Sequence, residues 1–416
     1  MNHVMRKAFG ITALVFALIG AEPVTAQSAM PDMVFLRLCG KGTPDEVREA
    51  LKSGANIAAK DTDDMTTLMW AARGNGDPAV MKVLLEAAAK FNEKGLGENN
   101  EKGLLEKGKE FWEKGKSKLG FKVVDINAGD KEDGKTALMF AVENKSPGVV
   151  QVLLENGADA SAKDKQGLTA LMRAAAKNPD PVIVKALLKD GAGINVKDKQ
   201  GKTALMWAAA ENSNPEVIKE LVEGGADANF KDKQGKTALM WAASKNSNPE
   251  MVKELVEGGA KIDAKDNYDM TALMWAAAEN SNPEVITAFL NEGVDVNAKN
   301  KKGKTALMCA AEKNSRPEMV KKLVRSGADI NAQDEQDRTA LMWAVAENFN
   351  PEVVVLLLEL KANTTAVDKS NHNVIWYAKQ RKWKDPVKEI LADPDPSILE
   401  KLDPVMIIKI LKRVLL

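Results

Sequence analysis

Methionine recurs at one position of a repeated segment in this sequence, and a row of thioethers raises the question of a copper(I) site, because copper(I) prefers soft ligands. Most of its members are 33 or 34 residues apart, and equivalent atoms of stacked segments lie about 10 Å from one another. That separation is too large for a shared coordination sphere, so we expect core packing and neither a metal nor a cofactor. The row consists of Met69, Met139, Met172, Met206, Met240, Met274, Met308 and Met342.

A second row follows one residue later and is mostly aromatic. Large side chains at a recurring position usually fill the space between packed segments, whereas an aromatic edge left exposed would anchor a partner. We expect mainly packing, with partner binding as the alternative. The second row consists of Trp70, Phe140, Arg173, Trp207, Trp241, Trp275, Cys309, Trp343 and Tyr377.

Histidine and cysteine are too few for the common catalytic and metal sites. His372 is the only histidine besides His3, and no nucleophile lies at a recognisable spacing from it. Cys39 and Cys309 lie about eight repeats apart, far beyond the roughly 6 Å between Cα atoms that a disulfide allows. We therefore expect two free thiols, no zinc site and no catalytic triad.

The elements that position both rows form a repeat of 34 residues. In the copy that begins at Thr203, this threonine can cap a first helix, Asn214 can cap a second, and Gly225 can end it. A turn around Gly235 then leads to the next copy. Successive copies begin at Thr136, Thr169, Thr203, Thr237, Thr271, Thr305 and Thr339, and a degenerate one begins at Asn373.

This repeat resembles the ankyrin repeat, on the strength of Thr-Ala-Leu-Met-Trp-Ala at its start and Gly-Ala-Asp-Ala-Asn near its end. The resemblance covers residues 33–391 and implies an all-α solenoid of about ten stacked helix-turn-helix units with turn or β-hairpin tips. Methionine stands where the family has histidine, so we expect packing to replace the hydrogen bonds of that histidine.

The N-terminus has the order of a secretory signal. Arg6 and Lys7 precede an apolar run, and Val-Thr-Ala precedes Gln27. We expect residues 1–26 to be a signal peptide and the protein to be exported, periplasmic or secreted if bacterial. No other long apolar segment occurs, so stable membrane insertion is not expected.

Two segments depart from the repeat. Residues 90–122 contain nine lysines and six glutamates and form an insertion, which we expect to be solvated or loosely docked. A partner-binding or membrane-surface helix is the alternative. Residues 393–416 should form C-terminal capping helices over the last repeat, with an anchor as the alternative.

Charge favours a protein partner. Basic and acidic residues number 59 each, and removing Arg6, Lys7 and Glu22 leaves 57 and 58. This balance argues against nucleic-acid binding. The leading hypothesis is a monomeric, non-catalytic interaction scaffold; an accessory protein that protects or regulates an exported enzyme is the alternative, and an enzyme with an unconventional site is the least favoured.

The resemblance places recognition on the tips and first helices. Lysines on several tips form an interrupted basic stripe, which favours a partner with an acidic surface. The candidate protein-binding residues are Lys199, Gln200, Lys202, Glu211, Lys233, Gln234, Lys236, Lys245, Asn267, Tyr268, Met270, Glu279, Lys301, Lys302, Lys304 and Lys313.

The first prediction concerns export. Because a basic start, a short apolar run and a small-residue site precede Gln27, we expect cleavage between Ala26 and Gln27. N-terminal sequencing of the protein purified from its own cells should begin at Gln27. A chain that still begins at Met1 would contradict this prediction.

Overall fold

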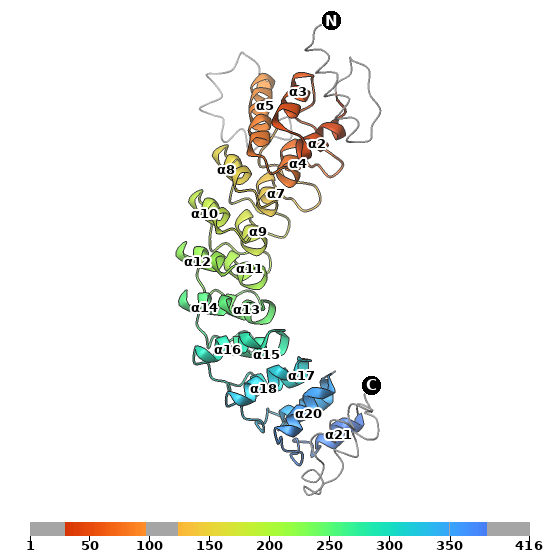
Figure 1. The fold of residues 1–416 in the computed structure, drawn as a ribbon, viewed down its shortest axis with the longest axis vertical. Coiled ribbons are helices and arrows are strands. Elements are labelled where there is room, and N and C mark those ends of the chain that lie inside the picture. Colours follow the sequence, from red (N-terminus) through yellow and green to blue (C-terminus); the bar gives the residue numbers. More distant parts are fainter. Residues whose placement is uncertain (1–29, 97–123, 349, 381–416) are drawn as a thin grey trace. The chain divides into compact units, whose positions relative to one another are not determined.

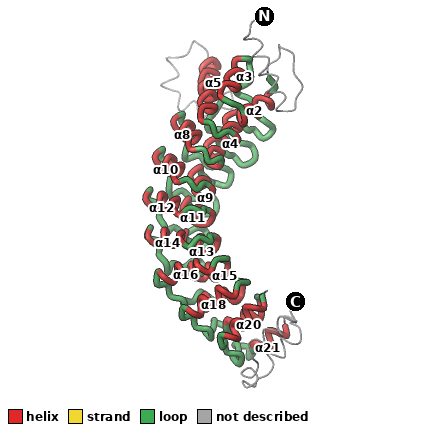
Figure 2. The backbone as a smooth tube through the Cα atoms, viewed as in Figure 1, coloured by secondary structure: helices red, strands yellow, loops and turns green. Residues whose placement is uncertain are grey.

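The computed structural model describes residues 30–96, 124–348 and 350–380. The expected signal peptide, residues 97–122 of the insertion and the expected capping helices lie outside these ranges. Each repeat in them is a pair of antiparallel helices followed by a turn. The predicted all-α array of helix pairs is confirmed (Figure 2).

The first helix of a repeat begins directly after its threonine. The Thr203 hydroxyl accepts a hydrogen bond from the Met206 N–H at 3.4 Å, and α11 runs over Ala204–Glu211. The predicted threonine cap is therefore confirmed. Thr136 and Thr237 are exceptions, because their buried hydroxyls have no partner.

The second helix begins after an asparagine and a proline. Asn214 Oδ1 accepts a hydrogen bond from the Glu216 N–H at 3.1 Å, and α12 runs over Pro215–Glu223. The chain leaves this helix through Gly225, whose φ of 93° is open to glycine without strain. Both predicted signals are confirmed.

The helices fall into two compact units, which we describe separately. In the first unit, α2 packs on α4 and α4 on α7, while α3 packs on α5, α5 on α8 and α8 on α10. Helix α9 (Ala170–Lys177) lies where the chain passes between the units. The bounds are α2 Asp32–Lys41, α3 Pro44–Lys52, α4 Thr67–Gly74, α5 Pro78–Leu96, α7 Ala137–Glu143, α8 Pro147–Glu155 and α10 Pro181–Lys189.

In the second unit, first helices contact first helices and second helices contact second helices. Figure 1 shows α11, α13, α15 and α17 in one row and α12, α14, α16 and α18 in the other. The remaining bounds are α13 Ala238–Lys245, α14 Glu250–Glu257, α15 Ala272–Glu279, α16 Pro283–Asn291, α17 Ala306–Lys313, α18 Pro317–Arg325, α19 Ala340–Glu347, α20 Pro351–Glu359 and α21 Val374–Gln380.

Helix α5 continues past the start of the expected insertion. It extends to Leu96 because Ala87, Ala88 and Ala89 favour helix and no glycine occurs before Gly95. Asn92 on this helix exchanges two hydrogen bonds with the Val124 backbone, each 3.0 Å long. This pair of bonds connects the helix to the point where the described chain resumes.

Methionines and alanines of the first helices form the core, as predicted. All eight members of the methionine row are at most 1% exposed. Cys39 and Cys309 are buried and unpaired, and burial raises the pKa of the Cys309 thiol to about 12. Within the described ranges, none of the helices is long and apolar enough to cross a membrane.

Buried asparagines connect neighbouring repeats by hydrogen bonds. These bonds stabilise the stack in addition to the packing that we expected to replace the hydrogen bonds of the family histidine. Asn280 Nδ2 donates to the Ala243 and Asn246 carbonyls of the preceding repeat at 2.7 and 2.8 Å. Its Oδ1 accepts from the Asn282 N–H at 2.8 Å. The same two donated bonds occur at Asn212, Asn246, Asn314 and Asn348.

The second prediction concerns this asparagine row. Asn280→Ala should lower the free energy of unfolding by about 2–4 kcal/mol, because it leaves two carbonyls of the preceding repeat buried without donors. Denaturant unfolding followed by tryptophan fluorescence measures the loss. Asn282→Ala, which removes the half-buried cap of α16 and one bond to the carbonyl of the exposed Ser247, should cost only about 1 kcal/mol. Equal losses in both variants would contradict the role of the buried amide.

Candidate protein-binding surface

Most tips, meaning the turns between one repeat and the first helix of the next, are closed by an aspartate. Asp198 Oδ1 accepts from the Gln200 and Lys202 N–H groups at 2.8 and 2.9 Å. Gly201 follows the turn with a φ of 86°. Asp232, Asp266 and Asp334 make the same pair of bonds.

Neighbouring tips of the second unit are joined directly through their backbones. The Lys233 N–H donates to the Gln200 carbonyl, and the Asn267 N–H donates to the Gln234 carbonyl, both at 3.1 Å. A Cβ atom at Gly235 would lie 2.7 Å from the Asn267 backbone nitrogen, so only glycine permits this approach. The Lys301, Glu335 and Lys369 N–H groups continue the series. The tips therefore form one continuous edge.

The second aromatic row binds the tip aspartates through their other oxygen. The Trp207 indole N–H donates to Asp198 Oδ2 at 3.0 Å. Trp241 donates in the same way to Asp232, Trp275 to Asp266 and Trp343 to Asp334. Each of these four tips is thus fixed to the first helix that follows it.

Sequence reasoning missed this pairing. Its signal is an aspartate nine residues before each tryptophan. The exception supports it, because the repeat with Cys309 in the tryptophan position has Asn300 in place of the aspartate. An amide at Asn300 still closes the turn but adds no unpaired charge.

A row of buried lysines lies between the indoles. The Lys202 ammonium is 4.3 Å from the Trp207 ring centre and 3.5 Å from that of Trp241. Lys236 lies at 4.7 and 3.2 Å from the ring centres of Trp241 and Trp275. Cations over indole faces are attracted by the ring quadrupole, most strongly where water is excluded.

Lys304 has the position of Lys236, two repeats later. Its ammonium lies 3.1 Å from the Trp343 ring centre and pairs with Glu312 at 2.9 Å. Burial lowers the pKa of Lys202, Lys236 and Lys304, while nearby carboxylates oppose that shift. Within the described ranges, no group of His, Cys, Asp and Glu side chains is arranged to bind a metal ion.

The family model for ankyrin repeats, built on three copies, matches seven overlapping windows that together span residues 109–398. The chain belongs to the ankyrin repeat family. Ankyrin repeats are generally protein–protein interaction modules and are typically non-catalytic. A comparison with curated proteins found no match.

Most of the predicted binding residues are exposed on the ankyrin tips or at the ends of the first helices. Tyr268 is 66% exposed. Lys245 pairs with Glu279 of the next repeat at 2.9 Å, and Met270 is half-buried. The other exposed candidates are Lys199, Gln200, Glu211, Lys233, Gln234, Asn267, Lys301, Lys302 and Lys313.

Three predicted residues differ from the expectation of freely solvated tips. Lys202, Lys236 and Lys304 are only 8%, 5% and 7% exposed. Our interpretation of these three lysines as part of an exposed basic stripe is therefore wrong. The reason lies in the neighbouring ankyrin repeat, whose tryptophan covers the lysine stem and contacts the ammonium.

The third prediction separates the two kinds of tip lysine. Lys236→Glu should lower the free energy of unfolding by about 2–4 kcal/mol, because it places a carboxylate between two indoles and near Asp232 and Asp266. Lys233→Glu, on the exposed part of the same tip, should change it by less than about 0.5 kcal/mol. Urea unfolding of the two variants provides the comparison.

A third variant, Lys236→Met, keeps an unbranched stem but removes the charge, so its loss should be smaller than that of Lys236→Glu. If Lys233→Glu and Lys236→Glu were equally stable, the buried ammonium would have no structural role.

Proposed function

We propose that this protein is an exported, non-catalytic scaffold that binds the acidic surface of a partner protein through the exposed tips of its second unit. The observation that carries the proposal is the continuous edge of directly hydrogen-bonded tips. Side chains on such an edge are already positioned before binding, which reduces the entropy cost of ordering them against a partner.

The charge of this edge supports an acidic partner surface. Lys199, Lys233, Lys301 and Lys302 are exposed, and Lys301 also donates to the Asn267 carbonyl at 2.7 Å. Rim lysines of this kind mainly raise association rates and select partners of opposite charge.

The tip of Tyr268 interrupts the lysines and supports a protein over a nucleic acid. The exposed ring is flanked by Asp269, so evenly spaced phosphates would meet an acidic group between the lysines. A protein can place an apolar contact there instead, and exposed tyrosines are frequent anchors at protein interfaces. Export is supported by the order of residue types in residues 1–26 alone.

The fourth prediction tests the tip surface. Lys199→Glu with Lys233→Glu should slow association with the partner at least about tenfold at low salt, since two steering charges are reversed. The effect should shrink in 1 M salt, where the Debye length is only about 3 Å. Stopped-flow or surface binding rates are measured against the protein recovered by affinity purification from the exported fraction.

Lys219→Glu with Lys253→Glu is the matched control. These exposed lysines lie on α12 and α14, the second helices that follow the two tips, and undergo the same change of charge. The control should retain most of the parent association rate. If the two double variants slowed binding equally, net charge rather than the tip surface would govern association.

A further inference from the structure

Phe140 interrupts the pairing between tip aspartates and first helices in the first unit. Asp130 closes this tip, and its Oδ1 accepts from the Asp133 and Lys135 N–H groups at 3.1 and 2.8 Å. No donor among the described residues reaches Asp130 Oδ2, because a phenyl ring replaces the indole and follows the aspartate by ten residues instead of nine. Asp130 is nevertheless only 7% exposed.

The same oxygen is paired elsewhere in the array. Asp61 accepts from Trp70 at 2.9 Å, and Asp368 accepts from the Tyr377 hydroxyl at 2.7 Å. Asp164 accepts from the Arg173 guanidinium. The Asp130 side chain is therefore largely covered, its Oδ1 accepts two backbone hydrogen bonds, and its Oδ2 has no donor among the described residues.

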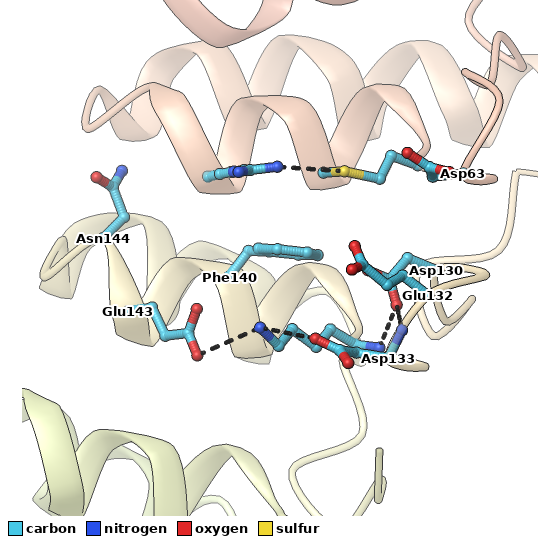
Figure 3. Close-up of a pocket in the computed structure, with 10 residues that line it drawn as sticks. Asp63, Asp130, Glu132, Asp133, Phe140, Glu143 and Asn144 are labelled. Carbon is cyan, nitrogen blue, oxygen red and sulfur yellow. Dashed lines mark hydrogen bonds and ion pairs between the residues drawn. The ribbon is translucent and has the colours of Figure 1, made fainter. Parts of the chain in front are cut away.

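A pocket of about 290 Å³ lies beside this oxygen. Figure 3 shows Asp63, Asp130 and Glu132 together at one end, with Phe140 next to them. Lys135 pairs with Asp133 at 3.2 Å, at the base of the same tip.

The charges that line the pocket do not cancel. It contains five carboxylates and two cations, Arg73 and Lys135, which leaves a formal charge of −3. Glu143 lies 3.8 Å from Lys135 and also pairs with Arg173. The carboxylates of Asp63, Asp130 and Glu132 have no ion-pair partner among the described residues. An incoming cation would therefore meet three unpaired carboxylates.

We infer that this pocket binds the guanidinium group of an arginine side chain supplied by a protein, at a site separate from the exposed tips. The next repeat supplies the precedent. Arg173 has the position of Phe140 one repeat later, and its guanidinium donates to both Asp164 and Glu143. A guanidinium thus fits this aspartate turn, and its planar set of donors suits several carboxylates at once.

A bare metal ion fits the pocket less well. No group of three or more potential ligands in the described ranges is arranged for one. A guanidinium would donate a charge-assisted hydrogen bond to Asp130 Oδ2, in the place of the indole N–H that donates to the aspartate in other repeats. Binding through this pocket would therefore complete an interaction that the chain leaves open at one repeat.

The fifth prediction uses N-acetyl-arginine amide as the probe in a titration of the full chain followed by NMR. The parent should bind it saturably in the millimolar range, and Asp130→Asn should weaken binding at least about tenfold by replacing an acceptor with a donor. This variant should fold, because Asn300 closes a turn with two backbone bonds to its amide oxygen, at 2.9 and 3.0 Å, although the Asp130 turn is one residue longer.

Phe140→Trp is the second variant. Its indole should donate to Asp130 and fill the space beside it, which should abolish probe binding and raise the thermal midpoint by about 2–4 °C. Glu86→Gln is the control, since it removes one exposed negative charge from α5 in the same unit, away from the pocket lining. It should bind the probe like the parent.

Three results would overturn the inference. They are the absence of saturable binding by the parent, equal binding by the parent and Asp130→Asn, and binding of spermidine without binding of the arginine probe. The last result would assign the pocket to a small polyamine. Because the probe needs no partner protein, this test is independent of the fate of the tip surface.

Discussion

The hydrogen bonds that asparagine donates across the repeat boundary are the interaction on which the stack depends. A pair of helices of eight or nine residues cannot bury its apolar faces alone. Its first helix also ends with carbonyls that have no partner within the helix. Asn280 and its equivalents supply donors to those carbonyls from the next repeat. Each repeat is therefore completed by its neighbour, which makes stability a property of adjacent pairs.

The edge of the second unit shows how the same coupling shapes the binding surface. One lysine of a tip, such as Lys236, is buried between two indoles, while Lys233, three residues earlier, remains exposed. The tip aspartate accepts both backbone and indole donors, so its carboxylate is fully used. What remains for a partner is a row of side chains on a backbone that its neighbours already fix.

Local signals explain why so much of the fold could be predicted. Thr203, Asn214 and Gly225 act through bonds or dihedral angles within a few residues, and a sequence displays them directly. The burial of Lys202 depends on Trp241, which lies in the next repeat. The sequence of a single tip therefore predicts that its lysines are exposed to solvent. The asparagine row was missed for the same reason, because its acceptors lie 34 and 37 residues earlier.

A departure from the repeat is informative when the donor of a hydrogen bond is replaced but its acceptor is kept. At Cys309 the donor is lost and the acceptor changes with it, since Asn300 replaces the aspartate. At Phe140 the donor is lost but the carboxylate of Asp130 remains, buried beside Asp63 and Glu132. A chain that only needed to close the turn could use the amide there too, as Asn300 does. The carboxylate retained at Asp130 leaves one oxygen without a donor among the described residues, and a cationic ligand would supply that donor.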